Sequence, residues 1–178
     1  MSRIHTPALD TATDATAEVY AQIKKAAGNV PNTYAAIGAH GPAALKAVLQ
    51  AEGVLAAGTL SKRDLETIKL IVSEVAGCDY CVAAHSMLGK LAGLKPDTLK
   101  QIRTGQQTGD ARRDALARFV RTLAQTRGTI SEDAFSAVKA AGYSDAQLVE
   151  ISLAVAVTTF TNVFNRINDT VIDFPAVA

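Results

Sequence analysis

The chain has 178 residues, of which 48% are hydrophobic and 20% are charged, a composition that can bury a substantial core and excludes a disordered chain. Eighteen basic residues against seventeen acidic ones give a net charge of +1, which argues against electrostatic binding of nucleic acid. The N-terminus lacks the charged-then-apolar pattern of a secretory signal, and the most apolar run, Ile151 to Phe160, is shorter than the ~20 residues of a membrane span. We therefore expect a soluble, cytoplasmic protein.

Alanine and leucine recur at helical spacing along most of the chain, and only 5% of residues are aromatic, which predicts an all-α fold. An irregular segment over residues 1–13 precedes one helical domain over residues 14–178, for which we expect about eight helices. In chain order, helical segments are predicted at about residues 14–26, 33–38, 42–55, 61–75, 78–91, 96–103 and 110–126, then after Ser131, and as a long last region from Ser144.

Local signals support several of these boundaries. Ser61 with Asp64, and Ser144 with Gln147, have the spacing of capping boxes at helix starts. The dipeptide at residues 76–77, Ala-Gly, predicts a break between the helix before it and the helix after it.

A thin internal similarity relates the two halves of the domain. Glu66 precedes Cys78 by twelve residues, and in a matching register Glu150 occupies the position of Glu66 while Asn165 occupies that of Cys81. This register indicates two pseudo-repeated halves, of which the second has lost the thiols.

The only cysteines, Cys78 and Cys81, lie too close together to staple distant segments, which points to chemistry rather than to stability. If a helix begins near Cys78, its free amide groups and dipole favour a nearby thiolate. Because residues three and four apart share a helical face, Cys81 lies one turn from both Cys78 and His85. The two sulfurs can then form a local disulfide, and the imidazole can exchange a proton with Cys81.

This arrangement is typical of peroxide reduction by thiols. A thiolate attacks the O–O bond and becomes a sulfenic acid, the second thiol condenses with it to give a disulfide and water, and an external thiol or dithiol reopens the disulfide.

Two other interpretations stay open from the spacing alone. Cys78, Cys81 and His85 could be part of a zinc site or could simply pack in a non-enzymatic helical module, although a zinc site would need a fourth ligand and the only other histidines, His5 and His40, stand alone in sequence. The pair could also serve a general dithiol–disulfide oxidoreductase or redox sensor. A thioredoxin-like domain is not expected because no βαβ pattern surrounds the motif.

The stretch LSKRDLETIKLIVSEVAGCDYCVAAH resembles the core motif of the alkylhydroperoxidase D-like and carboxymuconolactone decarboxylase superfamily, a glutamate followed after eleven residues by Cys-x-x-Cys-x-x-x-His. Glu66, Cys78, Cys81 and His85 match this motif position by position. The stretches GNVPNTYAAIGAHGPAAL and FTNVFNRINDTVIDFP are similar to the peroxidase-related branch, so the resemblance covers about residues 28–174.

The resemblance implies an all-α fold whose subunits assemble as dimers, trimers or hexamers, and a hydroperoxide reductase that needs neither a cofactor nor a metal. By the same resemblance, Cys81 is the peroxide-attacking thiol, Cys78 the resolving thiol, His85 the proton relay and Glu66 its acid/base anchor. The substrate is then a hydroperoxide and the reductant a thiol or dithiol, neither of which the sequence identifies further.

Two features depart from a simple transfer of the motif. Glu66 reaches the cysteines only if the chain turns near residues 76–77, and Glu74, four residues before Cys78, is the local competitor. Tyr80 stands between the cysteines where characterised peroxidases of this superfamily carry a second histidine, and a phenol is a poorer proton shuttle at neutral pH. Decarboxylating members generally lack the cysteine pair, which makes lactone decarboxylation the less favoured activity.

The polar residues Asn162, Asn165 and Arg166 lie in the last helical region. They could line the site from the second half, but we favour structural roles in capping and bridging helices.

Overall fold

The computed structural model describes residues 1–177, and every regular element within that range is helical. The elements are η1 (Leu9–Thr11), a 3-10 turn, and the α-helices α1 (Asp14–Ala27), α2 (Asn32–His40), α3 (Pro42–Ala56), α4 (Lys62–Ala76), α5 (Asp79–Leu91), α6 (Pro96–Thr104), α7 (Ala111–Thr126), α8 (Glu132–Ala140) and α9 (Asp145–Asn168). The predicted all-α fold is confirmed, with nine α-helices in the described range rather than about eight. The last residue of the predicted domain, residue 178, lies outside that range.

Polar side chains cap the helices at the predicted places. The Ser61 hydroxyl accepts a hydrogen bond from the backbone N–H of Asp64 at the start of α4, and the full capping box of Ser144 and Gln147 opens α9. Each such cap satisfies a backbone N–H group that the first helical turn leaves unpaired, and is worth about 1 kcal/mol. The first residues of α4 and α9, two helices that supply side chains to the site, are therefore determined by local sequence.

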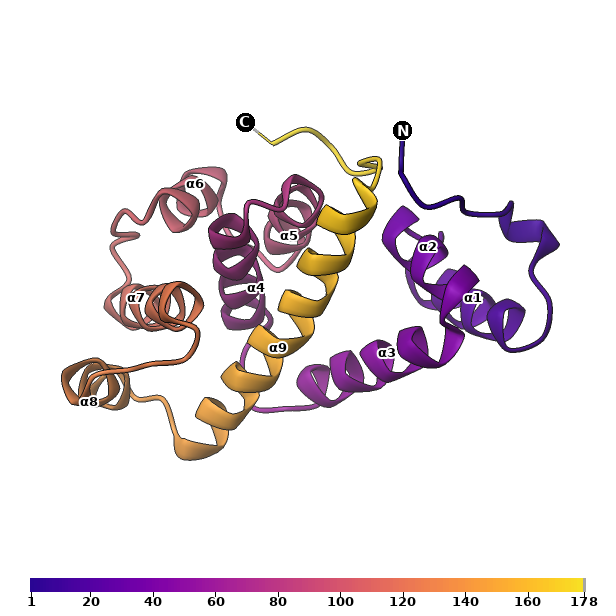
Figure 1. The fold of residues 1–178 in the computed structure, drawn as a ribbon. Helices are drawn as coiled ribbons and strands as arrows, with labels where there is room; N and C mark the ends of the chain where they lie inside the picture. The colour runs from indigo at the N-terminus through magenta and orange to yellow at the C-terminus, as the bar shows by residue number, and fades with distance from the viewer. Residues whose placement is uncertain (178) are drawn as a thin grey trace.

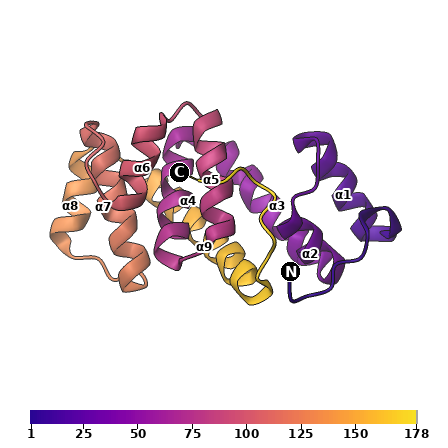
Figure 2. The ribbon, with the colours of Figure 1, turned by 90° about the horizontal axis from the view of Figure 1, so that it is seen from above.

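Helix α4 lies in the middle of the larger part of the molecule, where α5, α7 and α9 pack around it (Figure 1). Helices α6 to α8 lie on one side of α4 and α9, and the group α1 to α3 extends on the other, joined through α3 (Figures 1 and 2). The N-terminal segment runs to the end of α9, where the backbone N–H of Arg3 donates to the carbonyl of Asn168 at 2.7 Å.

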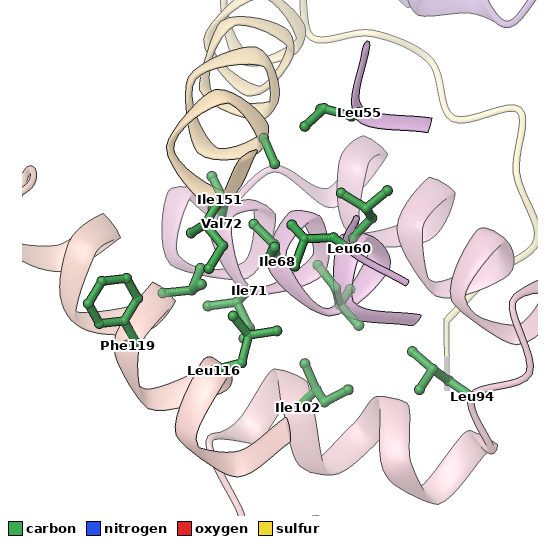
Figure 3. Packing of buried hydrophobic residues seen from close by; sticks show 14 of the residues in the cluster. Leu55, Leu60, Ile68, Ile71, Val72, Leu94, Ile102, Leu116, Phe119 and Ile151 are labelled. Atoms are coloured by element: carbon green, nitrogen blue, oxygen red, sulfur yellow. The ribbon is translucent and has the colours of Figure 1, made fainter. Parts of the chain in front are cut away.

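The main core surrounds α4 and contains aliphatic side chains from most helices (Figure 3). Ile68, Leu70 and Ile71 of α4 are fully buried, and Leu116 and Ile151 reach them from α7 and α9. Full burial of each such side chain contributes roughly 1.5–3 kcal/mol. A second, smaller core joins α1, α2 and α3. Because α4 is enclosed on most sides, the side chains it presents are held in fixed positions.

The chain breaks between α4 and α5 at the predicted place. Gly77 adopts a left-handed conformation, with φ 63° and ψ 40°, and its N–H bonds to carbonyls of the last turn of α4. The next N–H, that of Cys78, donates to the carbonyl of Ser73 at 3.0 Å and completes the cap. In the register of the internal similarity, Gly77 corresponds to Thr161, which lies inside the uninterrupted helix α9. The second half therefore does not keep the local architecture of the redox motif.

Helix α9 is much longer than the apolar run seen in the sequence. By length and composition alone it could cross a membrane, a test that a core helix of a soluble protein also passes. Its inner face packs on α4 and α3, whereas Val149, Phe160, Val163 and Ile167 are exposed on its outer face. This helix therefore carries an exposed apolar strip along most of its length.

The Gly77 turn generates a stability prediction. Replacing Gly77 by Ala adds a methyl group that meets nothing within 4 Å, so its whole cost is the left-handed backbone, and the free energy of unfolding should fall by about 1–2 kcal/mol. The matched control is Gly53→Ala, which also meets nothing but lies within α3, and should raise that free energy by roughly 0.5–1 kcal/mol. Chemical denaturation measures both; equal effects in the two variants would contradict this view of the turn.

Candidate active site

Four helices bring the predicted site residues together. Cys78 is the N-cap of α5, and Cys81 and His85 follow on successive turns of the same helix. Glu66 comes from α4, which runs beside α5. Asn165 reaches the thiols from α9, and the start of α2 closes the site from the remaining side. The turn at Gly77 is what allows α5 to lie along α4 rather than to continue it.

The two cysteines are reduced, buried and in direct contact. Their Sγ atoms are 2.6 Å apart, and Cys78 and Cys81 are only 2% and 3% exposed. Cys78 Sγ accepts a hydrogen bond from the backbone N–H of Cys81 at 3.4 Å, which is the bond that an N-cap side chain makes. Cys81 Sγ accepts one from Asn165 Nδ2 at 3.2 Å.

These contacts make the two thiols chemically unequal. The side-chain hydrogen bond shared with Cys81 lowers the pKa of Cys78, against the opposing effect of burial, and the Cys81 backbone N–H adds to the lowering. The same shared hydrogen bond, together with burial, raises the pKa of Cys81. The proton of Cys81 is therefore held more tightly than that of Cys78. When the pair loses its first proton, the negative charge lies on Cys78.

The structure brings Glu66, and not Glu74, to the histidine. The Nδ1–H group of His85 donates to Glu66 Oε2 at 2.9 Å, with both side chains largely buried. Glu74 instead accepts from Arg103 Nε of α6 at 2.8 Å. Because Nδ1 is held by the carboxylate, Nε2 is the nitrogen of His85 that remains to accept or return a proton.

Tyr80 contacts the start of α2 and the segment that follows α9. Its hydroxyl accepts from the backbone N–H of Thr33 at 3.2 Å and donates to Asp173 Oδ1 at 2.8 Å. Its ring packs edge-on against Phe174 with centroids 5.4 Å apart. Burial raises the pKa of Tyr80, so the phenol stays protonated. Since its one hydrogen is already donated, Tyr80 does not take the place of the histidine that occupies this position in characterised peroxidases.

A small pocket lies against the second cysteine. This Cys81 pocket has a volume of about 110 Å³ and is lined mostly by apolar groups, among them Ala84 and Phe174. It adjoins a larger pocket of about 460 Å³, which we call the outer pocket. Tyr34, His85 and Leu88 line both pockets and so separate them. These three side chains therefore lie at the boundary of the two pockets.

Two side chains of the site were missed or undervalued in the sequence. Asn165 was assigned a structural role, but its amide contacts Cys81 Sγ, and Thr33 Oγ1 donates to its Oδ1 at 2.6 Å. The internal similarity of the two halves, in which Asn165 occupies the position of Cys81, was the one signal in the sequence that could have indicated this contact. Tyr34 had no signal in the sequence. Its hydroxyl makes no hydrogen bond to any part of the chain that the structure describes, which leaves it free to donate.

The other polar residues of this region keep structural roles. Asn162 accepts from the Ser73 hydroxyl at 3.2 Å, and Arg166 donates to the carbonyl of Ala76 at the end of α4. Within residues 1–177, no three side chains of His, Cys, Asp or Glu lie close enough together to hold a metal ion. The geometry therefore gives the zinc interpretation no support.

Part of the chain is similar to a known protein family. The family model described as carboxymuconolactone decarboxylase family matches residues 42–119, a segment that contains Glu66, both cysteines and His85. This segment, somewhat less than half of the chain, is therefore similar to that family. The comparison with curated proteins gave no match.

Solved structures share the whole fold at low sequence identity. An uncharacterized peroxidase-related protein from Ralstonia eutropha JMP134, described as an alkylhydroperoxidase AhpD core, is 23% identical with a TM-score of 0.86, over 97% of this chain and 92% of its own. A peroxidase-related protein from Silicibacter sp. TM1040 is 20% identical with a TM-score of 0.81, over 96% and 91%. The debrominase Bmp8, in complex with 2,3,4-tribromopyrrole, is 18% identical with a TM-score of 0.82, over 97% and 92%. Enzymes therefore occur on this fold.

The unequal thiols generate a prediction about acidity. In Cys81→Ala the side-chain donor to Cys78 is lost, so the pKa of Cys78 should rise and its thiolate fraction at neutral pH should fall. In Cys81→Ser the hydroxyl still donates, so the pKa of Cys78 should stay lower than in the Ala variant. Ultraviolet absorbance of the thiolate across a pH titration measures both. The same pKa in the two variants would show that the shared hydrogen bond is not the cause.

Proposed function

We propose that this protein is a thiol-dependent hydroperoxide reductase that cycles Cys78 and Cys81 between dithiol and disulfide. The observation that supports this most is the contact of two buried free thiols, 2.6 Å apart, beside a His85–Glu66 pair and a small pocket. The similarity of residues 42–119 to the carboxymuconolactone decarboxylase family, and the fold shared with a peroxidase-related protein, agree with it. A structural thiol pair would need neither the paired histidine nor the pocket.

In the first step, Cys81 attacks the peroxide. Cys81 is the thiol that lines the pocket shared with His85, whereas Cys78 carries the first negative charge. As Cys81 Sγ bonds to one peroxide oxygen, its proton passes to the adjacent Cys78 thiolate and the O–O bond breaks. The leaving alkoxide takes a proton from His85, whose positive form Glu66 stabilises. The products are a Cys81 sulfenic acid, a Cys78 thiol and an alcohol.

In the second step, Cys78 resolves the sulfenic acid. Cys78 Sγ attacks Cys81 Sγ, the S–O bond breaks, and the hydroxide leaves with the Cys78 proton as water. The two sulfur atoms are already neighbours at the start of α5, so the disulfide can form without a rearrangement of the helices. An external thiol or dithiol then restores the reduced pair.

Tyr34 has the chemistry to position the substrate. Its hydroxyl has no hydrogen-bond partner in the described chain, it lines the Cys81 pocket, and its pKa is raised by burial and by Glu52 and Glu66, so it remains a donor. A peroxide oxygen in the pocket is an acceptor that this hydroxyl can satisfy.

Other parts of the sequence-based account stay predictions. A dithiol–disulfide oxidoreductase or redox sensor would use the same two cysteines, and turnover with peroxide rather than with disulfide substrates separates these alternatives. A cytoplasmic location and a homo-oligomeric state also stay predictions. The exposed apolar strip on α9 supports subunit association, because large contiguous apolar surfaces on soluble proteins commonly mark interfaces.

Variants of the site test the proposed activity. With a small organic hydroperoxide and a dithiol reductant, Cys81→Ser should abolish turnover, and Cys78→Ser should stop after one turnover at a sulfenic acid or mixed disulfide. Glu66→Gln should lower kcat/KM on the order of tenfold to a hundredfold because it removes the charge that orients and stabilises His85. Peroxide consumption measures turnover, and a sulfenic-acid reagent detects the trapped state.

Glu74→Gln is the matched control, since Glu74 lies on the same helix but pairs with Arg103, and its activity should stay near that of the unmodified protein. Full activity in Cys81→Ser would overturn the assignment of the attacking thiol. Loss of activity in Glu74→Gln with retention in Glu66→Gln would show that the wrong carboxylate has been placed in the proton relay.

A further inference from the structure

The two cysteines lie on the walls of two different pockets. Cys81 lines the pocket of about 110 Å³ that adjoins the outer pocket. Cys78 lines a separate pocket of about 460 Å³, which we call the Cys78 pocket, between the start of α5, the end of α9 and residues 1–3. Neither cysteine lines the pocket of the other, although their sulfur atoms are in contact. The cysteine pair therefore lies between the Cys78 pocket and the Cys81 pocket, with one sulfur atom next to each.

The chemical character of the two pockets differs as much as their size. The Cys78 pocket is lined largely by polar and charged groups, including Asp79, Arg166 and Asp169, with charges of both signs. The Cys81 pocket has mostly apolar walls and a quarter of that volume. A hydrated, ionised molecule keeps favourable partners in the first pocket, whereas in the second it loses its hydration without compensation.

We propose that the oxidised protein is reduced through the Cys78 pocket by a small hydrophilic thiol, while the hydroperoxide reaches Cys81 through the opposite, apolar pocket. This inference rests on the proposed redox cycle of the pair. It assigns a second binding site to the protein, and the ligand class is a thiol that reacts as its thiolate. Substrate and reductant then do not compete for one opening.

The exchange reaction balances with a thiol as its only co-reactant. The reductant thiolate attacks Cys78 Sγ, the Cys78–Cys81 bond breaks, and the electron pair leaves on Cys81 Sγ. The N–H of Asn165 Nδ2, 3.2 Å from that sulfur, stabilises the departing thiolate until it is protonated. A second reductant thiolate attacks the reductant sulfur in the mixed disulfide. The oxidised reductant leaves as a disulfide, and Cys78 leaves as the thiolate that its N-cap position favours.

Access decides which sulfur is attacked. The lowered pKa of Cys78 would by itself make it the better leaving group and direct attack to Cys81. To reach Cys81, however, a charged thiolate would have to enter the small apolar pocket, whose walls include Leu88 and Phe174. The Cys78 pocket offers a larger, polar approach to the other sulfur.

Two exposed side chains allow each pocket to be narrowed separately. Ile172 is 45% exposed and lines the Cys78 pocket but not the Cys81 pocket. Leu88 is 38% exposed and lines the Cys81 pocket but not the Cys78 pocket. The substitutions Ile172→Trp and Leu88→Trp therefore obstruct one opening each at positions where a larger side chain can extend into solvent.

The two half-reactions are then measured on each variant by counting thiols over time. Reduction starts from a disulfide made with diamide, so it does not depend on peroxide, and uses 2-mercaptoethanol. Ile172→Trp should slow this reduction by roughly tenfold or more and leave oxidation by a small organic hydroperoxide unchanged. Leu88→Trp should slow the oxidation and leave the reduction unchanged. The half-reaction that keeps its rate also shows that the variant is folded.

Slower reduction in Leu88→Trp with no change in Ile172→Trp would overturn the proposal, as would equal effects of both substitutions on both half-reactions. Failure of the hydroperoxide to oxidise the unmodified protein would contradict the proposed function alone. In that case, selective slowing of the diamide-formed disulfide's reduction by Ile172→Trp would still support the Cys78 pocket as the reductant site.

Discussion

Between Ala76 and Cys78 the chain turns back through a left-handed residue, and the position of every other group in the site depends on this turn. On one straight helix, Glu66 would lie about 18 Å along the axis from Cys78. With Gly77 in the left-handed conformation, α5 instead runs beside α4, and Glu66 Oε2 lies 2.9 Å from His85 Nδ1. The same turn makes Cys78 the N-cap of the new helix, so its sulfur meets the free amide groups of the first turn. One glycine thus fixes both the proton relay and the acidity of a thiol.

The site combines burial with a small number of directed polar contacts. Both thiols are almost fully buried, which by itself disfavours thiolates. The pKa of Cys78 is lowered against this effect by the side-chain hydrogen bond with Cys81, by the backbone N–H of Cys81 and by the positive charge of Arg166. Asn165 supplies a donor to the other sulfur from α9. The residues after α9 close the site through the contacts of Asp173 and Phe174 with Tyr80. Helix α4, enclosed by the core, gives these contacts a rigid support.

Local patterns were sufficient to predict the parts of the site that are close in sequence. Helical periodicity and capping residues indicated α4, α5 and the break between them, and the spacing of the cysteines and His85 indicated their shared face. The choice of Glu66 over Glu74 needed the family motif, because the sequence alone does not say how far the chain turns. Asn165, Tyr34 and Asp173 could not be predicted from periodicity, since each reaches the site from a separate part of the chain through tertiary packing. The role of Tyr80 could not be predicted either, because its hydroxyl hydrogen is donated to Asp173, which lies far away in the sequence.

The central claim is that a hydroperoxide converts the Cys78–Cys81 dithiol into a disulfide. The most direct measurement is a thiol titration of the reduced protein before and after one equivalent of a small organic hydroperoxide, with intact mass recorded alongside. The account predicts loss of both thiols and a mass decrease of about 2 Da, the two hydrogens removed when a disulfide forms. Survival of both thiols, with an unchanged mass, would contradict it.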